Sequence, residues 1–294
     1  MNKTTIQSLV NNTKQEMQDS CAELGDEELK AILTAIYQRY KYDYRDFEPL
    51  SLKRRIHTFM RKSQISDIHA LWRTLLHDQD FALRFNSEIS VGLTFFFRDF
   101  MLWDYLKTKH LPTLKGKAGI SVWHAGCSTG EEVYSMALLL EQLQLRQKTK
   151  THASDINYQF IKHAKEGRYA AIRSREFESH CQKANIDPQT VKRFSSYEED
   201  GGIRFDPLLS QNIIWEQKNI ITDEVIPTFD IIFCRNVLIY FNKSAKKRVL
   251  QKFARQLNPG GILILGFFDS LMSHHFPEEL IPYELHCKIY RKPV

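Results

Sequence analysis

The chain has 294 residues, 43% hydrophobic and 26% charged, which is long enough for a large α/β domain plus a smaller helical one. Its longest strongly apolar stretch, residues 260–268, is too short to span a bilayer, and residues 1–20 are too polar for a signal peptide. The net charge of +6 suggests an acidic partner surface or simply a solvated one, and basic runs interleaved with aromatic residues, typical of nucleic-acid binding, are absent.

Residues 1–90 are predicted to be wholly helical. Apolar residues recur there at helical spacing, and no alternation typical of strands occurs. The expected helices are residues 27–40, 51–62, 67–76 and 81–89. We therefore expect a helical N-terminal domain over residues 1–90, followed by a linker over residues 91–104.

After residue 118 the pattern changes to alternating strands and helices. Strands are expected at residues 120–125, 151–154, 229–234 and 261–266, and helices at 131–145, 158–165 and 244–257. Continuous apolar strands that alternate with helices predict a mostly parallel sheet covered on both faces, in an α/β domain over residues 105–294. Pro259, Gly260 and Gly261 are expected to end the last helix. Residues 283–291 alternate, which favours antiparallel pairing at the sheet.

Residues 168–215 interrupt this alternation. They contain a helical piece at residues 188–194 and then a turn, residues 198–202, between two short strand-like runs. We interpret the segment as a small subdomain inserted in the α/β domain.

A glycine-bearing turn links the first predicted strand to its helix. Residues 121–125 run into Gly126, and Gly130 precedes Glu131 and Glu132 at the helix start. Nucleotide-containing cofactors bind at this turn in α/β sheets, and glycines permit its tight backbone. A dinucleotide would place its pyrophosphate at the helix start, where two carboxylates repel it. The acids favour a ligand with an ammonium and a sulfonium, as in S-adenosylmethionine, although glutamates also favour helix starts through the helix dipole.

Two later strands also end in polar residues. Asp155 follows the strand at 151–154 and could accept hydrogen bonds from both ribose hydroxyls, or cap the next helix. Arg235 and Asn236 follow the apolar strand at 229–234, and Tyr240 comes shortly after. The carboxyl ends of such strands face the ligand, so all these side chains are candidates for the site.

Three consecutive phenylalanines, residues 95–97, precede Arg98 in the linker. They cannot all lie on one side of a helix, so we expect some to pack against each domain and to fix the linker beside the cofactor. Arg98 would then rest on an aromatic support. The alternative is a surface arginine that pairs with Asp99.

The cysteines are scattered along the chain without a CxxC motif or a Cys/His ligand spacing. They are Cys21, Cys127, Cys181, Cys234 and Cys287. We expect reduced thiols, no metal site and a cytoplasmic location.

Four motifs together resemble the chemotaxis receptor methyltransferases, the CheR family. They are residues 94–99, 125–132, 153–156 and 234–241. The resemblance runs from about residue 25 to the end. It implies a helical receptor-recognition domain, a Rossmann-like methyltransferase domain, and methyl transfer from S-adenosylmethionine to glutamate carboxylates of the chemoreceptor helical bundle. The inserted subdomain would be the one that, in some members, docks a C-terminal peptide of the receptor.

The resemblance also carries residue roles onto this sequence. With Gly126 of the turn, the residues that would line the cofactor site are Thr94, Arg98, Glu131, Asp155, Asn219, Ile220, Arg235 and Asn236. Arg98 and Tyr240 would lie nearest the reacting methyl group and are the expected catalytic residues.

A basic stripe on the helix at residues 51–62 is the candidate receptor surface. Lys53, Arg54, His57 and Arg61 are predicted to lie opposite the apolar side, and a basic stripe suits an acidic helical bundle. A solvated helix face is the alternative.

The sequence departs from the family at two places that bear on function. Gly92 stands where the family often has asparagine, and the segment from Phe267 to Asp269 differs from the usual pattern. These departures leave open a catalytically weakened, cofactor-binding regulator, or a methyltransferase that acts on a protein outside chemotaxis. A nicotinamide-dependent oxidoreductase would need a denser glycine loop without acids after it.

Overall fold

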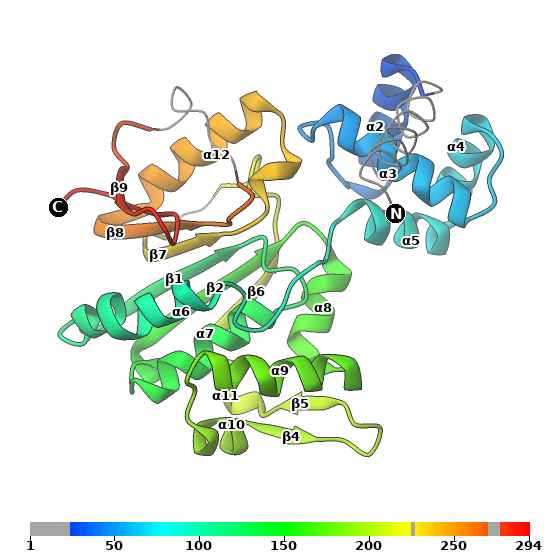
Figure 1. Cartoon of the computed structure of the whole chain (residues 1–294). Coiled ribbons are helices and arrows are strands. Elements are labelled where there is room, and N and C mark those ends of the chain that lie inside the picture. Colours follow the sequence, from blue (N-terminus) through cyan, green and yellow to red (C-terminus); the bar gives the residue numbers. More distant parts are fainter. Residues whose placement is uncertain (1–23, 225–226, 270–276) are drawn as a thin grey trace, which may run out of the picture. The chain divides into compact units, whose positions relative to one another are not determined.

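A computed structural model of the chain describes residues 24–224, 227–269 and 277–294 (Figure 1). Residues 1–23, with Cys21 and the start of the predicted helical domain, lie outside the described part. The chain forms two compact units. The first unit is Met1–Val91 with Tyr240–Ala245, and the second is Gly92–Ile239 with Lys246–Val294.

The described part of the first unit is built from helices. They are α2 (Asp26–Tyr40), α3 (Pro49–Lys62), α4 (Ile68–His77) and α5 (Gln79–Ile89), so the four predicted helices are confirmed. Three of them begin where a carboxylate accepts a hydrogen bond from a backbone N–H of the first turn, namely at Glu48, Asp67 and Asp78. Such caps satisfy amides that have no partner inside the helix, and they explain why the helices start there.

The core of the first unit is apolar and includes a segment from late in the chain. Phe59 packs edge-on against Phe81 and Phe85, with ring centroids 5.0 and 5.2 Å apart. Phe47 forms an isolated antiparallel bridge with Phe241, and their rings lie 5.3 Å apart. These contacts explain why Tyr240–Ala245 belongs to this unit rather than to the sheet.

The second unit contains a seven-stranded sheet in the order β6-β2-β1-β7-β8-β10-β9. The strands are β1 (Ile120–Ala125), β2 (Thr149–Asp155), β6 (Ile213–Gln217), β7 (Phe229–Cys234), β8 (Leu257–Leu265), β9 (Ile281–Glu284) and β10 (Ile289–Arg291). Strands β6, β2, β1, β7 and β8 are parallel, whereas β10 pairs antiparallel with β8 and β9 with β10. The mostly parallel α/β fold is therefore confirmed.

Helices cover both faces of this sheet. They are α6 (Phe100–Tyr105), a π-helical turn (Leu106–His110), 3₁₀ turns (Leu111–Leu114, Arg146–Lys148, Leu238–Tyr240), α7 (Glu131–Gln142), α8 (Tyr158–Glu166) and α12 (Lys243–Gln256). On β1, Trp123 packs against Phe253 of α12, whereas Val122 belongs to the core cluster that contains Trp103 of α6 and Leu138 of α7. Because neighbouring strand residues point to opposite faces, α12 lies across the sheet from α6 and α7.

The inserted subdomain follows α8. It consists of β3 (Arg168–Tyr169), α9 (Ala171–Lys183), α10 (Pro188–Phe194), β4 (Ser195–Tyr197), β5 (Ile203–Phe205) and α11 (Pro207–Ser210). Its strands form a separate antiparallel sheet in the order β3-β5-β4 (Figure 1). At the predicted turn between β4 and β5, Glu198 forms ion pairs with Arg168 and Arg204.

The structure corrects several boundaries. The insertion ends before β6, whose first residues fall inside the predicted 168–215 because β6 pairs with β2 in the main sheet. The predicted linker includes the start of α6, and α9 was not predicted. Helix α12 ends at Gln256, and β8 already starts at Leu257, since a register shift against β7 accommodates Pro259–Gly261 within the strand. Residues 283–291 form parts of two strands with a turn between them, not one strand.

Among the described residues, no helix combines the length and the apolar character needed to cross a membrane.

Candidate active site

The turn after β1 is fastened to the neighbouring strand. The amides of Gly126 and Cys127 both donate to the carbonyl of Ser154, at 2.8 and 2.9 Å. Gly126 and Gly130 have φ angles of +85° and +95°, which L side chains rarely adopt. A Cβ on Gly126 would also lie 2.5 Å from a methyl carbon of Val237. The predicted need for glycine therefore has a structural basis at Gly126.

Asp155 lies at the carboxyl end of β2 and holds two loops with its carboxylate. Its oxygens accept from the amides of Ser128 and Asn157, both at 2.9 Å. The side chain has no cation as an ion-pair partner among the described residues, and burial raises its pKa to about 6 although the backbone donors oppose this. Each oxygen retains a second lone pair, so the carboxylate can still accept from a hydroxyl.

Glu131 and Glu132 occupy different environments at the start of α7. Glu132 accepts from His124 and from Arg235, each at 2.8 Å, and these partners outweigh burial and lower its pKa. Glu131 is only 2% exposed and accepts a side-chain hydrogen bond from Thr129 at 2.6 Å. Burial raises the pKa of Glu131 to about 7. Glu131 is thus the member of the pair that a cationic ligand would complement.

Buried polar atoms without a hydrogen-bond partner gather at the same end of three adjacent strands. Within the described residues they include Ser128 Oγ after β1, Asn157 Nδ2 after β2, and both Nδ2 and Oδ1 of Asn236 after β7. A buried polar group without a partner is costly, and proteins rarely leave several in one place. The set supplies both donors and acceptors, which a nucleoside or an amino acid group can satisfy.

The turn that carries Asn236 is held by a residue that the sequence reasoning did not assign to the site. The carboxylate of Asp269 accepts from the amides of Asn236, Gly266 and Ile239, at 2.6, 2.8 and 3.2 Å. Asn236 has a left-handed backbone, with φ of 58°, and a Cβ on Gly266 would come within 2.3 Å of its amide nitrogen. The signal available in the sequence was an acid shortly after an apolar strand that ends in glycine.

Asn219 and Ile220 lie just after β6, the strand beside β2. The Asn219 side chain accepts from the amide of Ile221 at 2.9 Å, and Lys252 of α12 donates to the carbonyl of Ile220 at 2.8 Å. The predicted cofactor residues that follow β6, β2, β1 and β7 are thus gathered at the carboxyl edge of four adjacent strands.

The linker before α6 is packed into the second unit. Phe96 packs against Phe177 with centroids 4.9 Å apart, and Phe97 against Trp103 at 5.3 Å. Thr94 is half-buried, and the half-buried guanidinium of Arg98 lies 6.0 Å from the Phe95 ring. Asp99 pairs with Arg235 and not with Arg98, so the alternative of an Arg98–Asp99 pair is wrong.

Arg235 has a different environment from the one predicted. Its side chain is 4% exposed and pairs with Glu132 and Asp99, and it also donates to the carbonyl of Arg98 at 3.0 Å. The guanidinium is therefore committed to protein groups. This leaves the backbone of Arg235 as the part that could contact a ligand.

Gly92, the departure from the family pattern, has a local explanation. A Cβ at this position would lie 2.7 Å from the Phe160 ring of α8. The aromatic ring fills the space that a side chain at position 92 would need, so Gly92 and Phe160 form a matched pair.

The remaining predicted residues belong to the first unit. The Tyr240 ring lies 4.5 Å from the Arg55 guanidinium, and its carbonyl accepts from the amide of Glu48 at 2.8 Å. On α3, Arg54 and Arg61 are exposed, as predicted for a basic stripe.

Two members of the predicted basic stripe do not belong to it. Lys53 is 9% exposed and pairs with Asp26 at 2.6 Å, so its assignment to an exposed stripe is wrong. His57 is half-buried, and its Nε2 is enclosed without a partner among the described residues. Their positions follow from the tight packing of α3, which covers more of the helix than its apolar residues alone suggest.

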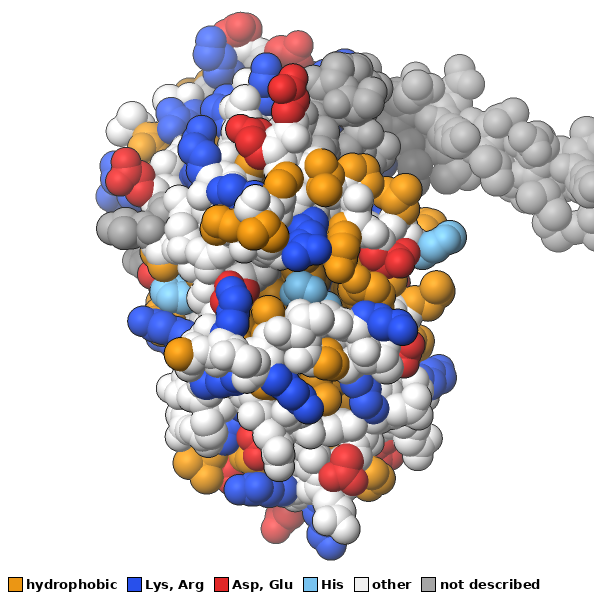
Figure 2. Space-filling view, turned by 90° about the vertical axis from the view of Figure 1, so that its left-hand side faces the viewer, with side chains coloured by type: hydrophobic (Ala, Val, Ile, Leu, Met, Phe, Trp, Pro, Cys, Tyr) orange, Lys and Arg blue, Asp and Glu red, His pale blue; other side chains and the backbone are white. Residues whose placement is uncertain are grey.

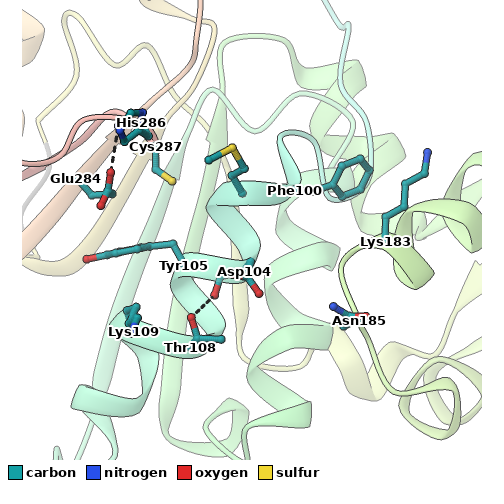
Figure 3. Close-up of a pocket in the computed structure, with 11 residues that line it drawn as sticks. Phe100, Asp104, Tyr105, Thr108, Lys109, Lys183, Asn185, Glu284, His286 and Cys287 are labelled. Atoms are coloured by element: carbon teal, nitrogen blue, oxygen red, sulfur yellow. Dashed lines mark hydrogen bonds between the residues drawn. The ribbon is translucent and has the colours of Figure 1, made fainter.

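A surface hollow of about 510 Å³ lies elsewhere on the second unit (Figure 3). Residues from three segments converge on it: Asp104, Tyr105 and Thr108 from α6 and its extension, Lys183 and Asn185 at the end of α9 and just after it, and Glu284, His286 and Cys287 around the β9–β10 turn (Figure 3). The face drawn in Figure 2 shows hydrophobic side chains gathered beside lysine and arginine side chains. None of the predicted cofactor residues lines this hollow, so it is separate from the site at the strand ends.

The geometry fits a nucleoside with a cationic tail. Asp155 offers an acceptor next to the glycine turn. Within the described part of the chain, the buried Glu131 forms no ion pair, and both Nδ2 and Oδ1 of Asn236 lack a hydrogen-bond partner. These residues would hold S-adenosylmethionine. The fold and site define an S-adenosylmethionine-dependent methyltransferase.

Comparisons with known proteins give the family. Residues 92–285 match the family described as CheR methyltransferase, SAM binding domain, and residues 27–90 match the CheR methyltransferase all-alpha domain. The chain belongs to the CheR methyltransferase family.

Curated relatives agree. A Pseudomonas putida protein, provisionally named methyltransferase Cher3, is 33% identical over 91% of this chain and 97% of its own length. The chemotaxis protein methyltransferase of Listeria monocytogenes is 30% identical over 77% and 84%, and that of Borreliella burgdorferi is 25% identical over 92% and 98%.

Proposed function

We propose that this protein methylates glutamate side chains in the cytoplasmic helical bundle of chemoreceptors, the reaction of chemotaxis adaptation. The observation that carries the proposal is the group of polar side chains at the carboxyl ends of the parallel strands: the buried carboxylates of Glu131 and Asp155, and the Asn236 amide, whose Nδ2 and Oδ1 have no hydrogen-bond partner among the described residues. The names of the curated chemotaxis methyltransferases support the choice of acceptor.

When bound, S-adenosylmethionine supplies a methyl group on a positively charged sulfur, and its transfer to a glutamate carboxylate turns an anion and a cation into two neutral products. A site of low dielectric favours such a loss of charge. The glutamate is already ionised near neutral pH, so no strong general base is required. The protein contributes mainly by holding the reactants in place.

Each predicted residue then has a distinct task. Asp155 would accept hydrogen bonds from the ribose hydroxyls, and Glu131 would neutralise the positive charge of the amino acid part. Asn236, Asn219 and Thr94 would complete the hydrogen bonds to the cofactor. Arg98 would orient the acceptor carboxylate, since its half-buried guanidinium makes no hydrogen bond or ion pair with the residues that the structure describes.

Two parts of the proposal rest on the family pattern. Tyr240 would hold the donor or the acceptor through its hydroxyl. The exposed Arg54 and Arg61 of α3 would attract the acidic receptor bundle, and the inserted subdomain would be the place for a receptor C-terminal peptide.

The test is methyl transfer with tritiated S-adenosylmethionine and a purified cytoplasmic fragment of a chemoreceptor. Glutamate methyl esters release volatile methanol in base, so base-labile tritium is the expected product. A receptor fragment with glutamine in place of the accepting glutamates is the matched control. Label that resists base, or no label in spite of tight S-adenosylhomocysteine binding, would contradict the proposal and favour the regulator.

A further inference from the structure

The linker turn that carries Arg98 has a strained backbone. Phe97 and Asp99 have φ angles of 49° and 63°, in the left-handed region that residues with a Cβ, and bulky ones above all, avoid. Strain of this kind persists only where the surroundings enforce it, and it concentrates at functional sites. The side chains that enforce it here are therefore candidates for a role in the reaction.

Side chains of the second unit hold this turn through its backbone. His180 donates to the carbonyl of Phe96 at 2.7 Å, and Ser135 accepts from the amide of Phe97 at 2.9 Å. The carbonyl of Arg98 accepts twice, from Trp103 Nε1 at 2.9 Å and from Arg235 Nη2 at 3.0 Å. Both lone pairs of this carbonyl are thus used, which fixes the orientation of the peptide group beside the Arg98 side chain.

Each of the two donors is itself rigid. Trp103 is 1% exposed and lies between Phe97 and Phe233, with centroids 5.3 and 6.1 Å away. Arg235 is held by its ion pairs with Glu132 and Asp99, and Glu132 is held in turn by His124. Buried, fully paired groups of this kind position other groups without reacting themselves.

We propose that Trp103 and Arg235 are positioning residues that set the Arg98 side chain for methyl transfer by clamping its carbonyl. This inference rests on the proposed function of Arg98. Neither side chain would contact the reactants, so each would act through Arg98 alone. Loss of one donor should lower kcat and change the affinity for S-adenosylhomocysteine little.

Trp103→Phe is the sharpest variant because it removes the N–H donor and keeps an aromatic ring of smaller size. Trp123→Phe is its matched control: Trp123 is equally buried and donates to Ser154 Oγ at 2.9 Å, but it packs on the α12 side of the sheet. Both variants should lose similar stability. We expect kcat to fall about tenfold in Trp103→Phe and to stay within about twofold in Trp123→Phe.

A double-mutant cycle separates positioning from a general structural effect. If Trp103 acts through Arg98, Trp103→Phe should cause no further loss of kcat in an Arg98→Ala background. Arg235→Lys, which keeps a charge for Glu132 but cannot span all three partners, should behave like Trp103→Phe. An unchanged kcat in Trp103→Phe, an equal loss in Trp123→Phe, or multiplicative losses in the cycle would overturn the proposal.

Hydrogen exchange gives a readout that needs no receptor. The amide of Phe97 should exchange faster in Trp103→Phe than in the wild type, and its exchange rate should be unchanged in Trp123→Phe. Equal exchange rates of the Phe97 amide in the two variants would contradict the proposed positioning role, whether or not the receptor fragment is a substrate. Absence of wild-type methyl transfer, with the exchange difference intact, would instead defeat only the proposed function.

Discussion

Replacing Glu131 by glutamine should raise the stability of the unliganded protein and weaken cofactor binding. The pKa of Glu131 is raised by burial from its ordinary 4.5 to about 7. At about 1.36 kcal/mol for each pH unit, ionisation of this buried acid costs the folded state about 3 kcal/mol. An amide at this position can still accept from Thr129, but its own N–H atoms are buried, which returns part of the gain.

The direction of the stability change with pH follows from the difference in the pKa of Glu131 between the folded and unfolded chain. The folded chain keeps a proton on Glu131 up to about pH 7, whereas the unfolded chain loses it near pH 4.5. The contribution of this group to the free energy of unfolding therefore falls between these two pH values and is constant outside them. Glu131→Gln should exceed the wild type by about 1–3 kcal/mol at pH 8, and the difference should vanish near pH 4.5.

Glu132→Gln is the matched control because the neighbouring acid is in the opposite situation. Its pKa is lowered by His124 and Arg235, so loss of the charge leaves a buried guanidinium with one partner fewer. It should be less stable than the wild type at pH 8, by about 3 kcal/mol. Urea unfolding of both variants at pH 5 and pH 8 measures the two opposite changes.

The affinity for the cofactor should fall in Glu131→Gln, although its stability rises. A charged hydrogen bond of about 1.5–3 kcal/mol is lost, so the Kd for S-adenosylhomocysteine should rise at least about tenfold at pH 8. At pH 7 the wild type should release a fraction of a proton on binding, seen by calorimetry in buffers of different ionisation enthalpy, and Glu131→Gln should release less. A glutamine variant that is less stable than the wild type at pH 8, or that binds with unchanged affinity, refutes the reasoning.

Three further variants test other parts of the site. Asp155→Asn should weaken S-adenosylhomocysteine binding about 100-fold in calorimetry. It should cause no loss of stability at pH 8, because burial raises the pKa of Asp155 to about 6 and so disfavours the ionised form in the fold. An unchanged affinity would remove Asp155 from the site. Gly266→Ala should displace the Asn236 turn and lower both urea stability, by about 1–3 kcal/mol, and cofactor affinity, whereas Gly116→Ala, with no atom within 4 Å of its new Cβ, should change neither. Charge reversal at Arg54 and Arg61 should raise the KM for the receptor fragment and leave the Kd for S-adenosylhomocysteine unchanged. Charge reversal at the exposed Arg73 on α4 should leave this KM unchanged. Equal increases in KM would show that only the net charge matters.

The periodic elements could be predicted because each has a strong local signal. Helices α3 to α5 start at capping carboxylates, and the central strands β1 and β7 are continuous apolar runs. The elements that were missed depend on distant contacts. Strand β6 is half-exposed at an edge of the parallel strands and carries Trp215 and Glu216 side by side, so neither alternation nor a long apolar run marks it. Helix α9 has few buried residues, which leaves a weak helical period.

The site was predictable where a residue type and a strand end coincide. Asp155 and Asn236 were predicted for this reason, and they lie at the carboxyl ends of β2 and β7, the two strands that flank β1. Asp155 is buried, as are the side-chain Nδ2 and Oδ1 atoms of Asn236. Lys53 was predicted for the receptor surface and the Arg235 side chain for the cofactor site. Both instead form ion pairs within the protein, and a sequence does not show which acid, such as Asp26 or Asp99, the fold brings next to a basic residue. Asp269 was noticed only as a departure, although it fixes the Asn236 turn through three amides.

The two glutamates at the start of α7 show what decides function in such a site. From the sequence alone, either acid could bind a cationic ligand; in the structure Glu131 is buried and Glu132 is partly buried. Glu132 already pairs with Arg235, and through Arg235 its charge helps to fix the linker turn. Glu131 forms no ion pair among the described residues, and the more distant Arg173 only partly offsets its burial. The fold therefore bears most of the cost of its desolvation until a cation binds. The same pair of acids thus supplies one group for positioning and one for binding, and the partner of each, not its place in the sequence, makes the difference.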